Sequence, residues 1–359
     1  MIYRQLGVRL WGEGAYEREQ IDGAETKYSA FNQIAPDDLV VNKIWARNGA
    51  VAVTTAENAG THVSPEFPVF ALDRERIDPR WMRSITKWHG FWKACDGKAQ
   101  GSSGKNRITP GQFLSVEIPL PTLVEQQALV ARLDALAKKT REVEKHLDAA
   151  ERHADHLLAL RFRDLIANAP RHSMAEVAPT VRRPVEIDVT KRYREVGARS
   201  FGKGLFVKPD FDGADATWQK PVWVRSGDLV LSNIKAWEGA IAVADDEHDG
   251  CIASHRYITC TPEPKQATPG FLAYYLLSEE GLEQVGFASP GTADRNRTLS
   301  LGNLRRIKVP VPAFTAQQTF DRLQSDVATL KAKHAAIREA NAALLPATLE
   351  RIFHTEATA

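Results

Sequence analysis

Apolar residues recur at steps of three and four through the middle of the chain, which predicts one long helix. Residues 122–169 contain neither proline nor glycine. The apolar positions that we assign to one seam of this helix are Leu129, Leu133, Leu136, Val143, Leu147, Ala150, Ala154 and Leu157, with Thr140 as a polar member. This spacing is typical of a coiled coil, and a seam of this kind needs a partner helix.

A second run with the same spacing lies near the C-terminus. Its apolar seam positions are Phe320, Leu323, Val327, Leu330, Ile337 and Leu344, with His334 and Asn341 as polar members. We expect Pro346 to end the pattern, because proline removes a backbone donor and clashes with the preceding turn. The simplest interpretation is that residues 122–169 and 313–353 form an antiparallel coiled coil. Forty-odd helical residues would make a rod roughly 60 Å long, which we interpret as a spacer.

The chain also repeats itself with a shift of 190 residues. The motif YRxxGxRxxGxG occurs twice, with Tyr3, Arg4, Gly7, Arg9, Gly12 and Gly14 matching Tyr193, Arg194, Gly197, Arg199, Gly202 and Gly204. This period is far longer than that of solenoid repeats. The sequence therefore predicts a duplicated unit, in which a globule is followed by a long helix.

The segments after each motif predict a β-hairpin in each globule. LVVNKI at 39–44 and LVLSNI at 229–234 lead into a turn that ends at glycine, and AVAV or AIAV follows. Pro79 and Pro269 open short helical segments. The repeat closes on IPLP and VPVP, each followed by a Gln-Gln pair at the start of a long helix.

The expected fold is α+β, with two similar α/β domains at 1–121 and 170–312 separated by the two long helices. Residues 354–359 form a tail. One asymmetry stands out: about twenty residues, 172–192, precede the second motif, whereas two residues precede the first. We therefore expect the first domain to have a short N-terminus and to lack the counterpart of this lead-in.

Composition narrows the class of protein but not its partner. The net charge of +2 is too small to identify a nucleic-acid-binding protein, since one basic face can coexist with acidic surface elsewhere. No stretch of 18 apolar residues and no leader peptide is visible, which predicts a soluble, cytoplasmic protein. The cysteines Cys95, Cys251 and Cys260 show no C-x-x-C pairing, and we expect them to be buried small hydrophobes.

No catalytic motif is present in the sequence. It contains no phosphate-binding loop, dinucleotide fingerprint, nucleophile elbow or H-E-x-x-H pair, and no Asn-Pro-Pro-aromatic tetrad of amino-methyltransferases. The paired glycines of the repeated motif are better explained as turn residues with positive φ. His153 and His156 could hold a metal by their spacing, but a solvent-facing position on the helix is the better explanation. We therefore predict no catalytic residue, cofactor or metal.

Basic and amide side chains recur in loops at equivalent places of the two halves. In the first half these are Lys43, Arg47 and Asn48 in the hairpin turn, and Lys105, Asn106 and Arg107 before the Pro-x-Pro segment. In the second half they are Asn233, Lys235 and Trp237, and Arg295, Asn296 and Arg297. Arg suits guanine and Asn suits adenine, so these loops are candidates for DNA contacts. The competing interpretation is a solvated, charged loop.

The doubled layout, the YRxxGxR motifs, Gly227-Asp228-Leu229 and the IPLP-then-Gln-Gln helix entry resemble the specificity subunit of type I restriction-modification systems. The resemblance covers nearly the whole chain. It implies two target recognition domains, each reading one half of a split double-stranded DNA site. It also implies assembly with two methyltransferase subunits, which methylate adenine, and with restriction subunits, which cleave DNA. Asp37 departs from the pattern, because it stands where the hairpin signature has glycine.

Two alternatives belong to other classes of protein. The chain could itself be a methylase or a nuclease, which the lack of a catalytic motif argues against. It could instead be a coiled-coil adaptor that organises protein partners without reading DNA. The duplicated basic loops favour DNA recognition over the adaptor.

Overall fold

The computed structural model describes residues 1–100, 106–216, 220–291 and 297–356. The chain divides into two compact units. Unit 1 consists of Met1–Ala149 and Lys333–Ala359, and unit 2 is Ala150–Ala332. Each unit contains one globule together with about half of each long helix, so the boundaries between the units run through the helices rather than at their ends.

The globule of unit 1 is built from short antiparallel strand pairs and three helices. The pairs are β1 (Ile2–Tyr3) with β4 (Ile21–Asp22), β2 (Leu6–Val8) with β3 (Ala15–Glu17), and β5 (Asn32–Gln33) with β8 (His62–Val63). A three-stranded sheet has the order β7 (Val51–Val53), β6 (Leu39–Val41), β9 (Val69–Phe70). The helices are α1 (Pro79–Ile85), α2 (His89–Lys98) and α3 (Pro110–Leu114).

Unit 2 repeats this arrangement strand for strand. Its pairs are β11 (Arg192–Tyr193) with β14 (Phe211–Asp212), β12 (Val196–Ala198) with β13 (Leu205–Val207), and β15 (Val222–Trp223) with β18 (Ile252–Ala253). The three-stranded sheet is β17 (Ile241–Val243), β16 (Leu229–Ser232), β19 (Tyr257–Cys260), and the helices are α6 (Pro269–Leu277), α7 (Glu279–Phe287) and α8 (Leu301–Leu304). The α+β class and the duplication predicted from the sequence are confirmed.

The predicted hairpins are present in both units. Leu39 pairs with Val53 in unit 1, and Leu229 pairs with Val243 in unit 2. Each turn passes through one 3-10 turn, η1 (Ala46–Asn48) or η4 (Ala236–Glu238), and ends at a glycine with φ of 76° or 79°. Glycine is required at Gly49 for a second reason, since a Cβ there would lie 2.6 Å from the indole of Trp92.

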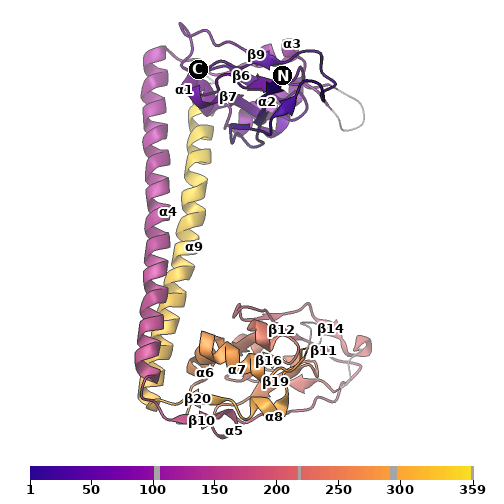
Figure 1. Ribbon diagram of the computed structural model, residues 1–359, viewed down its shortest axis with the longest axis vertical. Coiled ribbons are helices and arrows are strands. Elements are labelled where there is room, and N and C mark those ends of the chain that lie inside the picture. Colours follow the sequence, from indigo (N-terminus) through magenta and orange to yellow (C-terminus); the bar gives the residue numbers. More distant parts are fainter. Residues whose placement is uncertain (101–105, 217–219, 292–296, 357–359) are drawn as a thin grey trace. The chain divides into compact units, whose positions relative to one another are not determined.

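Two long helices complete the fold, α4 (Leu123–Ile166) and α9 (Phe314–Glu356). They lie side by side within each unit (Figure 1). In unit 1, Asn341 Nδ2 donates to the carbonyl of Thr140 at 3.1 Å. In unit 2, Lys331 Nζ lies 2.6 Å from Asp155 Oδ1. Further along α4, Asp148 pairs with Arg338 in unit 1 and Phe162 packs on Phe320 in unit 2. Within each unit the residue numbers of α9 fall as those of α4 rise, so the predicted antiparallel pairing is confirmed.

Three seam assignments are wrong. Leu157, Ile337 and Leu344 are 43%, 45% and 47% exposed. The residues one position later, Leu158, Arg338 and Leu345, are buried or half-buried instead. A strict heptad assumes 3.5 residues per turn, whereas a straight α-helix has 3.6, so the buried stripe drifts away from a heptad row along these helices.

Pro346 does not end the apolar pattern, contrary to the expectation, and the helix runs past it as the predicted range 313–353 requires. Helix α9 continues through it to Glu356. Beyond the proline, Leu349 and Phe353 are buried, and the Phe353 ring packs on Trp81 with 4.8 Å between centroids. Burial of these two side chains against the core of unit 1 offsets the hydrogen bond that the proline cannot make.

One buried glutamine fixes the start of each long helix on its globule. Gln126 Nε2 donates to the carbonyls of Arg76 and Pro121 at 2.9 and 2.7 Å, and its Oε1 accepts from the Asp78 amide at 2.8 Å. Gln317 makes the same three bonds, to Gln266, Pro312 and Thr268, at 2.9, 2.8 and 3.0 Å. Both side chains are fully buried. This set of bonds explains why the first residue of each Gln-Gln pair is a glutamine.

The long helices contribute to the cores of the globules. Val130, Leu133, Leu349 and Phe353 join Trp81 and Phe91 in unit 1, and Leu158, Phe162, Phe320 and Val327 join Phe271 and Leu272 in unit 2. The three cysteines are buried, as predicted, and burial raises the pKa of the Cys95 and Cys260 thiols to about 12. His153 and His156 are exposed on α4. No helix among the described residues is both long and apolar enough to cross a membrane.

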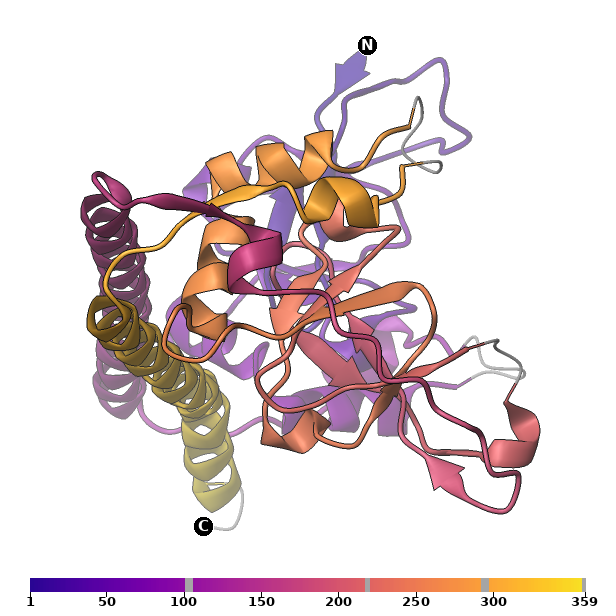
Figure 2. The same cartoon turned by 90° about the horizontal axis from the view of Figure 1, so that it is seen from below.

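Unit 2 has a lead-in segment that the described part of unit 1 lacks. After α4, the chain forms β10 (Arg171–Ser173), which pairs with β20 (Lys308–Pro310), and then α5 (Met174–Val177). Figure 2 shows this segment running on across unit 2. At its far end, Arg183 donates to both oxygens of Asp228 at 2.7 and 3.2 Å. Asp228 is 1% exposed, so the lead-in supplies the counterion of a buried carboxylate.

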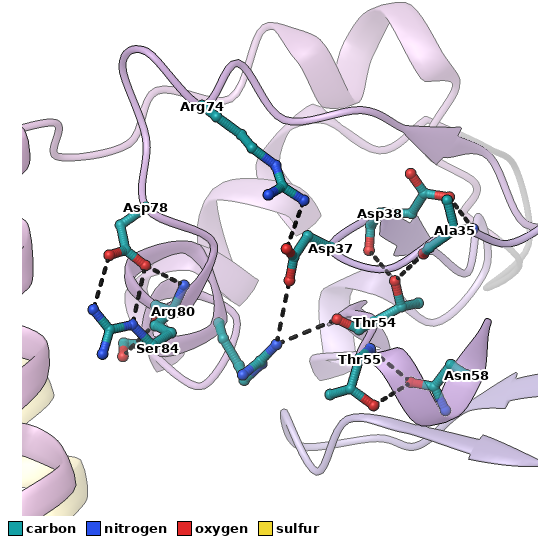
Figure 3. A network of polar contacts seen from close by, with 11 residues as sticks. Ala35, Asp37, Asp38, Thr54, Thr55, Asn58, Arg74, Asp78, Arg80 and Ser84 are labelled. Atoms are coloured by element: carbon teal, nitrogen blue, oxygen red, sulfur yellow. Dashed lines mark hydrogen bonds and ion pairs between the residues drawn. The ribbon is translucent and has the colours of Figure 1, made fainter.

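The corresponding region of unit 1 is arranged differently (Figure 3). Asp38, the equivalent of Asp228, is half-exposed and accepts a hydrogen bond from the Ala35 amide at 2.8 Å. The preceding Asp37 has φ of 64°, matching the 83° of Gly227. Aspartate tolerates this left-handed conformation better than most residues, and its carboxylate is paired with Arg74 at 2.6 Å. The departure from glycine therefore leaves the turn intact.

Candidate nucleic-acid interface

Each globule has a hollow at the same place in the repeat. The hollow of unit 2 has a volume of about 790 Å³, and that of unit 1 about 260 Å³. Both are lined by positions 190 residues apart, namely Gln5 and Glu195, Arg18 and Lys208, Asn42 and Ser232, Ile44 and Ile234, Ser64 and Ser254, Glu66 and Arg256, and Phe67 and Tyr257. We call these the hollow of unit 1 and the hollow of unit 2.

Matching backbone bonds build the two hollows. The amide of Arg18 donates to the carbonyl of Gln5 at 2.7 Å, and the amide of Lys208 donates to that of Glu195 at 2.8 Å. These bonds hold the long basic side chain beside residue 5 or 195 in each unit. The residue at 5 or 195 also forms a parallel bridge, to His62 in unit 1 and to Ile252 in unit 2. The frame is therefore shared, and the side chains on it differ.

The hollow of unit 2 is strongly basic. Its lining includes four cationic side chains, Arg182, Lys208, Lys220 and Arg256, and one carboxylate, Glu195. The Glu195 side chain is only 7% exposed, and its Oε1 lies 2.9 Å from Lys208 Nζ. One of the four cations is therefore neutralised locally, and the other three leave an excess of positive charge at the hollow.

The hollow of unit 1 is smaller and nearly neutral. Gln5 stands where unit 2 has Glu195, and Glu66 stands where it has Arg256. Glu66 Oε2 lies 3.2 Å from Arg107 Nη1, in an exposed ion pair. Trp45, His62 and Tyr28 add aromatic surface to the lining. The two hollows thus offer different sets of donors, acceptors and charges on one frame.

A neighbouring cleft of about 430 Å³ extends the hollow of unit 2, with Arg182, His255 and Tyr257 lining both. Asn233 lines this cleft, and its buried Oδ1 accepts no hydrogen bond from any described residue. In the hollow of unit 1, the buried Nδ1 of His62 is likewise without a partner in the described part of the chain. Buried polar atoms rarely remain unsatisfied, so both atoms are candidates for contact with a ligand.

The hairpin-turn residues predicted to bind DNA lie beside these hollows, because Ile44 and Ile234, which line them, belong to the two turns. Lys43 Nζ donates to the carbonyl of Pro65 at 2.7 Å. Arg47 and Asn48 are half-exposed in η1. Lys235 Nζ lies 2.5 Å from Glu238 Oε1 and 5.2 Å from the centroid of the Trp237 ring, and Lys235 lowers the pKa of the Glu238 carboxyl.

The second group of predicted residues is described in part. Lys105, Arg295 and Asn296 lie outside the described residues. Asn106 is half-exposed, and Arg107 pairs with Glu66. Arg297 stacks on Trp237, with 4.5 Å between its Cζ and the ring centroid, and donates to the carbonyl of Gly286 at 3.1 Å. The structure thus gives Arg297 a role in fixing the C-terminal end of α7, whereas its role toward DNA stays a prediction.

Sequence reasoning missed most of the residues that line the hollows. Gln5 and Glu195 directly follow the Tyr-Arg of the repeated motif, and Arg18 and Lys208 are both basic at equivalent positions. Comparing the two copies of the repeat for unlike polar side chains would have found Gln5 and Glu195. Comparing them for conserved basic charge would have found Arg18 and Lys208. Nothing in the sequence shows that these positions meet Ser64 or Ser254.

The similarity of this chain to known proteins lies in its fold. No protein-family model matches it, and no curated protein sequence matches it. Among solved structures, the HsdS subunit from Thermoanaerobacter tengcongensis superposes with a TM-score of 0.65 at 18% identity, covering 99% of this chain and 91% of that one.

A second chain comes from a structure described as the basis of complex assembly and conformational transition of the type I R-M system. It has a TM-score of 0.65 at 18% identity and covers 93% of this chain and 85% of that one. At this level of identity the likeness concerns the fold. Taken with the duplicated globules and the antiparallel helices, it shows that this chain has the fold of the HsdS subunit.

Proposed function

We propose that this chain is the DNA sequence-recognition subunit of a type I restriction-modification complex. Each globule reads one half of a split site in double-stranded DNA. The chain supplies specificity and no catalysis, whereas partner subunits methylate adenine and cleave DNA. In this proposal its partners are DNA, two methyltransferase subunits and restriction subunits.

The observation that carries the proposal is the pair of hollows at equivalent positions with unlike linings. A duplicated protein can read two different half-sites with one docking frame used twice, provided that the side chains differ where the bases are read. The shared backbone bonds at residues 5 and 195 supply the frame, and the change from Gln5 to Glu195 supplies the difference. The excess positive charge of the hollow of unit 2 suits a polyanion.

Direct binding tests the first part of the proposal. Purified chain, alone and together with its methyltransferase subunits, would be titrated with random-sequence duplex DNA at several salt concentrations. Phosphate contacts predict an affinity that falls steeply as salt rises. A chain that co-purifies with helical protein partners and shows no salt-dependent binding to duplex DNA would instead be the coiled-coil adaptor.

Division of labour tests the second part. The chain alone is expected neither to methylate nor to cleave DNA, and adding the methyltransferase subunits is expected to give adenine methylation at a split site. Methylation by the lone chain, measured with a labelled methyl donor, would contradict the proposal. The mass of the reconstituted assembly in solution would give the number of methyltransferase subunits, for which we expect two.

A further inference from the structure

We propose that the two hollows are the base-reading sites of their units, and that the residue at position 5 or 195 determines which base each unit prefers. This inference rests on the proposed function, and it assigns the reading to residues that the loop motifs did not identify. The ligand class is the exposed edge of a base pair in duplex DNA.

The first step concerns the carboxylate of Glu195. A basic hollow that bound only backbone phosphates would be weakened by a carboxylate, because the two negative groups repel each other. Glu195 nevertheless lines the hollow of unit 2, and Lys208 Nζ, 2.9 Å away, compensates its charge. A carboxylate accepts hydrogen bonds and donates none, so it selects bases that present an amino group, cytosine N4 or adenine N6.

The second step concerns the groups around it. The cationic side chains of Arg182, Lys220 and Arg256 line the same hollow and suit the phosphates that flank the base. The orphan Oδ1 of Asn233 in the adjoining cleft is a further acceptor. The hollow of unit 2 therefore combines phosphate-binding cations with acceptors for an amino group.

The third step is the comparison with unit 1. Gln5 occupies the frame position of Glu195, and its amide both donates and accepts hydrogen bonds. Such an amide pairs with adenine through N6 and N7, as a carboxylate cannot. The neighbouring His62 Nδ1 is a buried polar atom without a partner among the described residues. The two units are thus set to prefer different bases at corresponding places of their half-sites.

The test uses the full chain assembled with its methyltransferase subunits and a random duplex DNA library, followed by sequencing of the bound fraction. Glu195→Gln keeps the shape of the side chain and removes its charge. We expect this variant to change the preferred base at one position of one half-site by about tenfold, and to leave the other half-site unchanged. The reciprocal variant, Gln5→Glu, is expected to change the other half-site.

Glu280→Gln is the matched control. It also removes an ion-paired carboxylate from unit 2, where Glu280 pairs with Arg171, and it does not line the hollow. It is expected to select the wild-type site. Thermal unfolding of each variant shows whether it is folded, and Gln5→Glu tests the inference independently if Glu195→Gln unfolds.

The possible results separate the inference from the proposed function. If the wild-type assembly enriches no sequence, the proposed function fails. If the wild type enriches a split site and both variants enrich the same site, with or without a uniform loss of affinity, the function stands and the base-reading role of positions 5 and 195 is overturned. A change in both half-sites with a single variant overturns it as well.

Discussion

The two units share a backbone but anchor their central hairpins differently. In both units, the carboxylate of the aspartate that opens the hairpin accepts a hydrogen bond from the backbone amide three residues earlier. Ala35 donates to Asp38 in unit 1, and Arg225 donates to Asp228 in unit 2. In unit 2 that carboxylate is also buried and held by Arg183 and Thr261. The difference shows that the turn needs only the hydrogen bond between the backbone amide and the aspartate carboxylate. The buried ion pair of unit 2 holds the lead-in segment against the hairpin.

The largest expected effect comes from replacing the aspartate that opens the hairpin in each unit. Asp228→Ala removes a buried carboxylate and leaves Arg183 without its counterion, which should destabilise unit 2 by about 3 kcal/mol. The equivalent Asp38→Ala should cost about 1 kcal/mol in unit 1, because it removes one bond from a half-exposed group. Hydrogen exchange followed by mass spectrometry reports the stability of each unit separately. Equal losses in the two units would contradict the account.

The second prediction concerns a feature that the units share. Gln126→Ala and Gln317→Ala each remove three hydrogen bonds of a fully buried side chain, to two carbonyls and one amide, which should cost roughly 2 kcal/mol in the affected unit. The adjacent Gln127 and Gln318 are exposed, so Gln127→Ala and Gln318→Ala are matched controls with little expected effect. Chemical denaturation of the four variants would measure the difference. Equal effects of the buried and exposed substitutions would show that these bonds do not hold the helix starts.

A third prediction concerns the polarity of the seam between the long helices, which differs between the two units. The seam of unit 2 contains Phe320 and Val327, whereas that of unit 1 contains Asn341, 9% exposed, which donates to the Thr140 carbonyl and to Glu144. Asn341→Leu should stabilise unit 1 by about 1 kcal/mol, since a polar seam residue lowers stability while it fixes register. The midpoint of chemical denaturation shows whether the variant is more or less stable than the wild type. A loss of stability would mean that the two hydrogen bonds outweigh the apolar gain.

The smallest expected effect depends on pH and belongs to unit 2. The Arg171 guanidinium lowers the pKa of the Glu280 carboxyl, so their pairing stabilises the protein above the pKa of the unfolded carboxyl, about 4.3, and is lost as pH falls through the lower folded value. Both groups are partly exposed, and the contribution should stay below about 1 kcal/mol. The wild type should therefore exceed Glu280→Gln in stability at pH 7 and match it near pH 2. A difference that grows toward low pH would contradict this assignment.

Features set by local sequence were predictable. The hairpins follow from apolar, strand-forming segments on both sides of a short turn that ends at glycine, and the positive φ values of Gly12, Gly14, Gly202 and Gly204 agree with their interpretation as turn residues. The pairing of α4 with α9 follows from the apolar spacing. The exact seam did not, because a straight helix drifts from a heptad row, and Leu158 rather than Leu157 is buried.

Features that depend on long-range packing were hidden. The apolar pattern continues past Pro346 because Leu349 and Phe353 reach the core of unit 1, which a local helix rule does not include. The partner of Asp228 is 45 residues away in the chain. The lining of each hollow combines segments that meet only in the folded globule, so the loop motifs did not identify Gln5 or Glu195.

The central claim is that one scaffold, used twice, reads two halves of one DNA site. The most direct test is to map methylated adenines across the genome of a host that expresses this chain with its methyltransferase subunits. The account predicts a split site, with two specified half-sites and an unread gap of fixed length, and no such methylation without the chain. A continuous site, or methylation that does not depend on the chain, would contradict it.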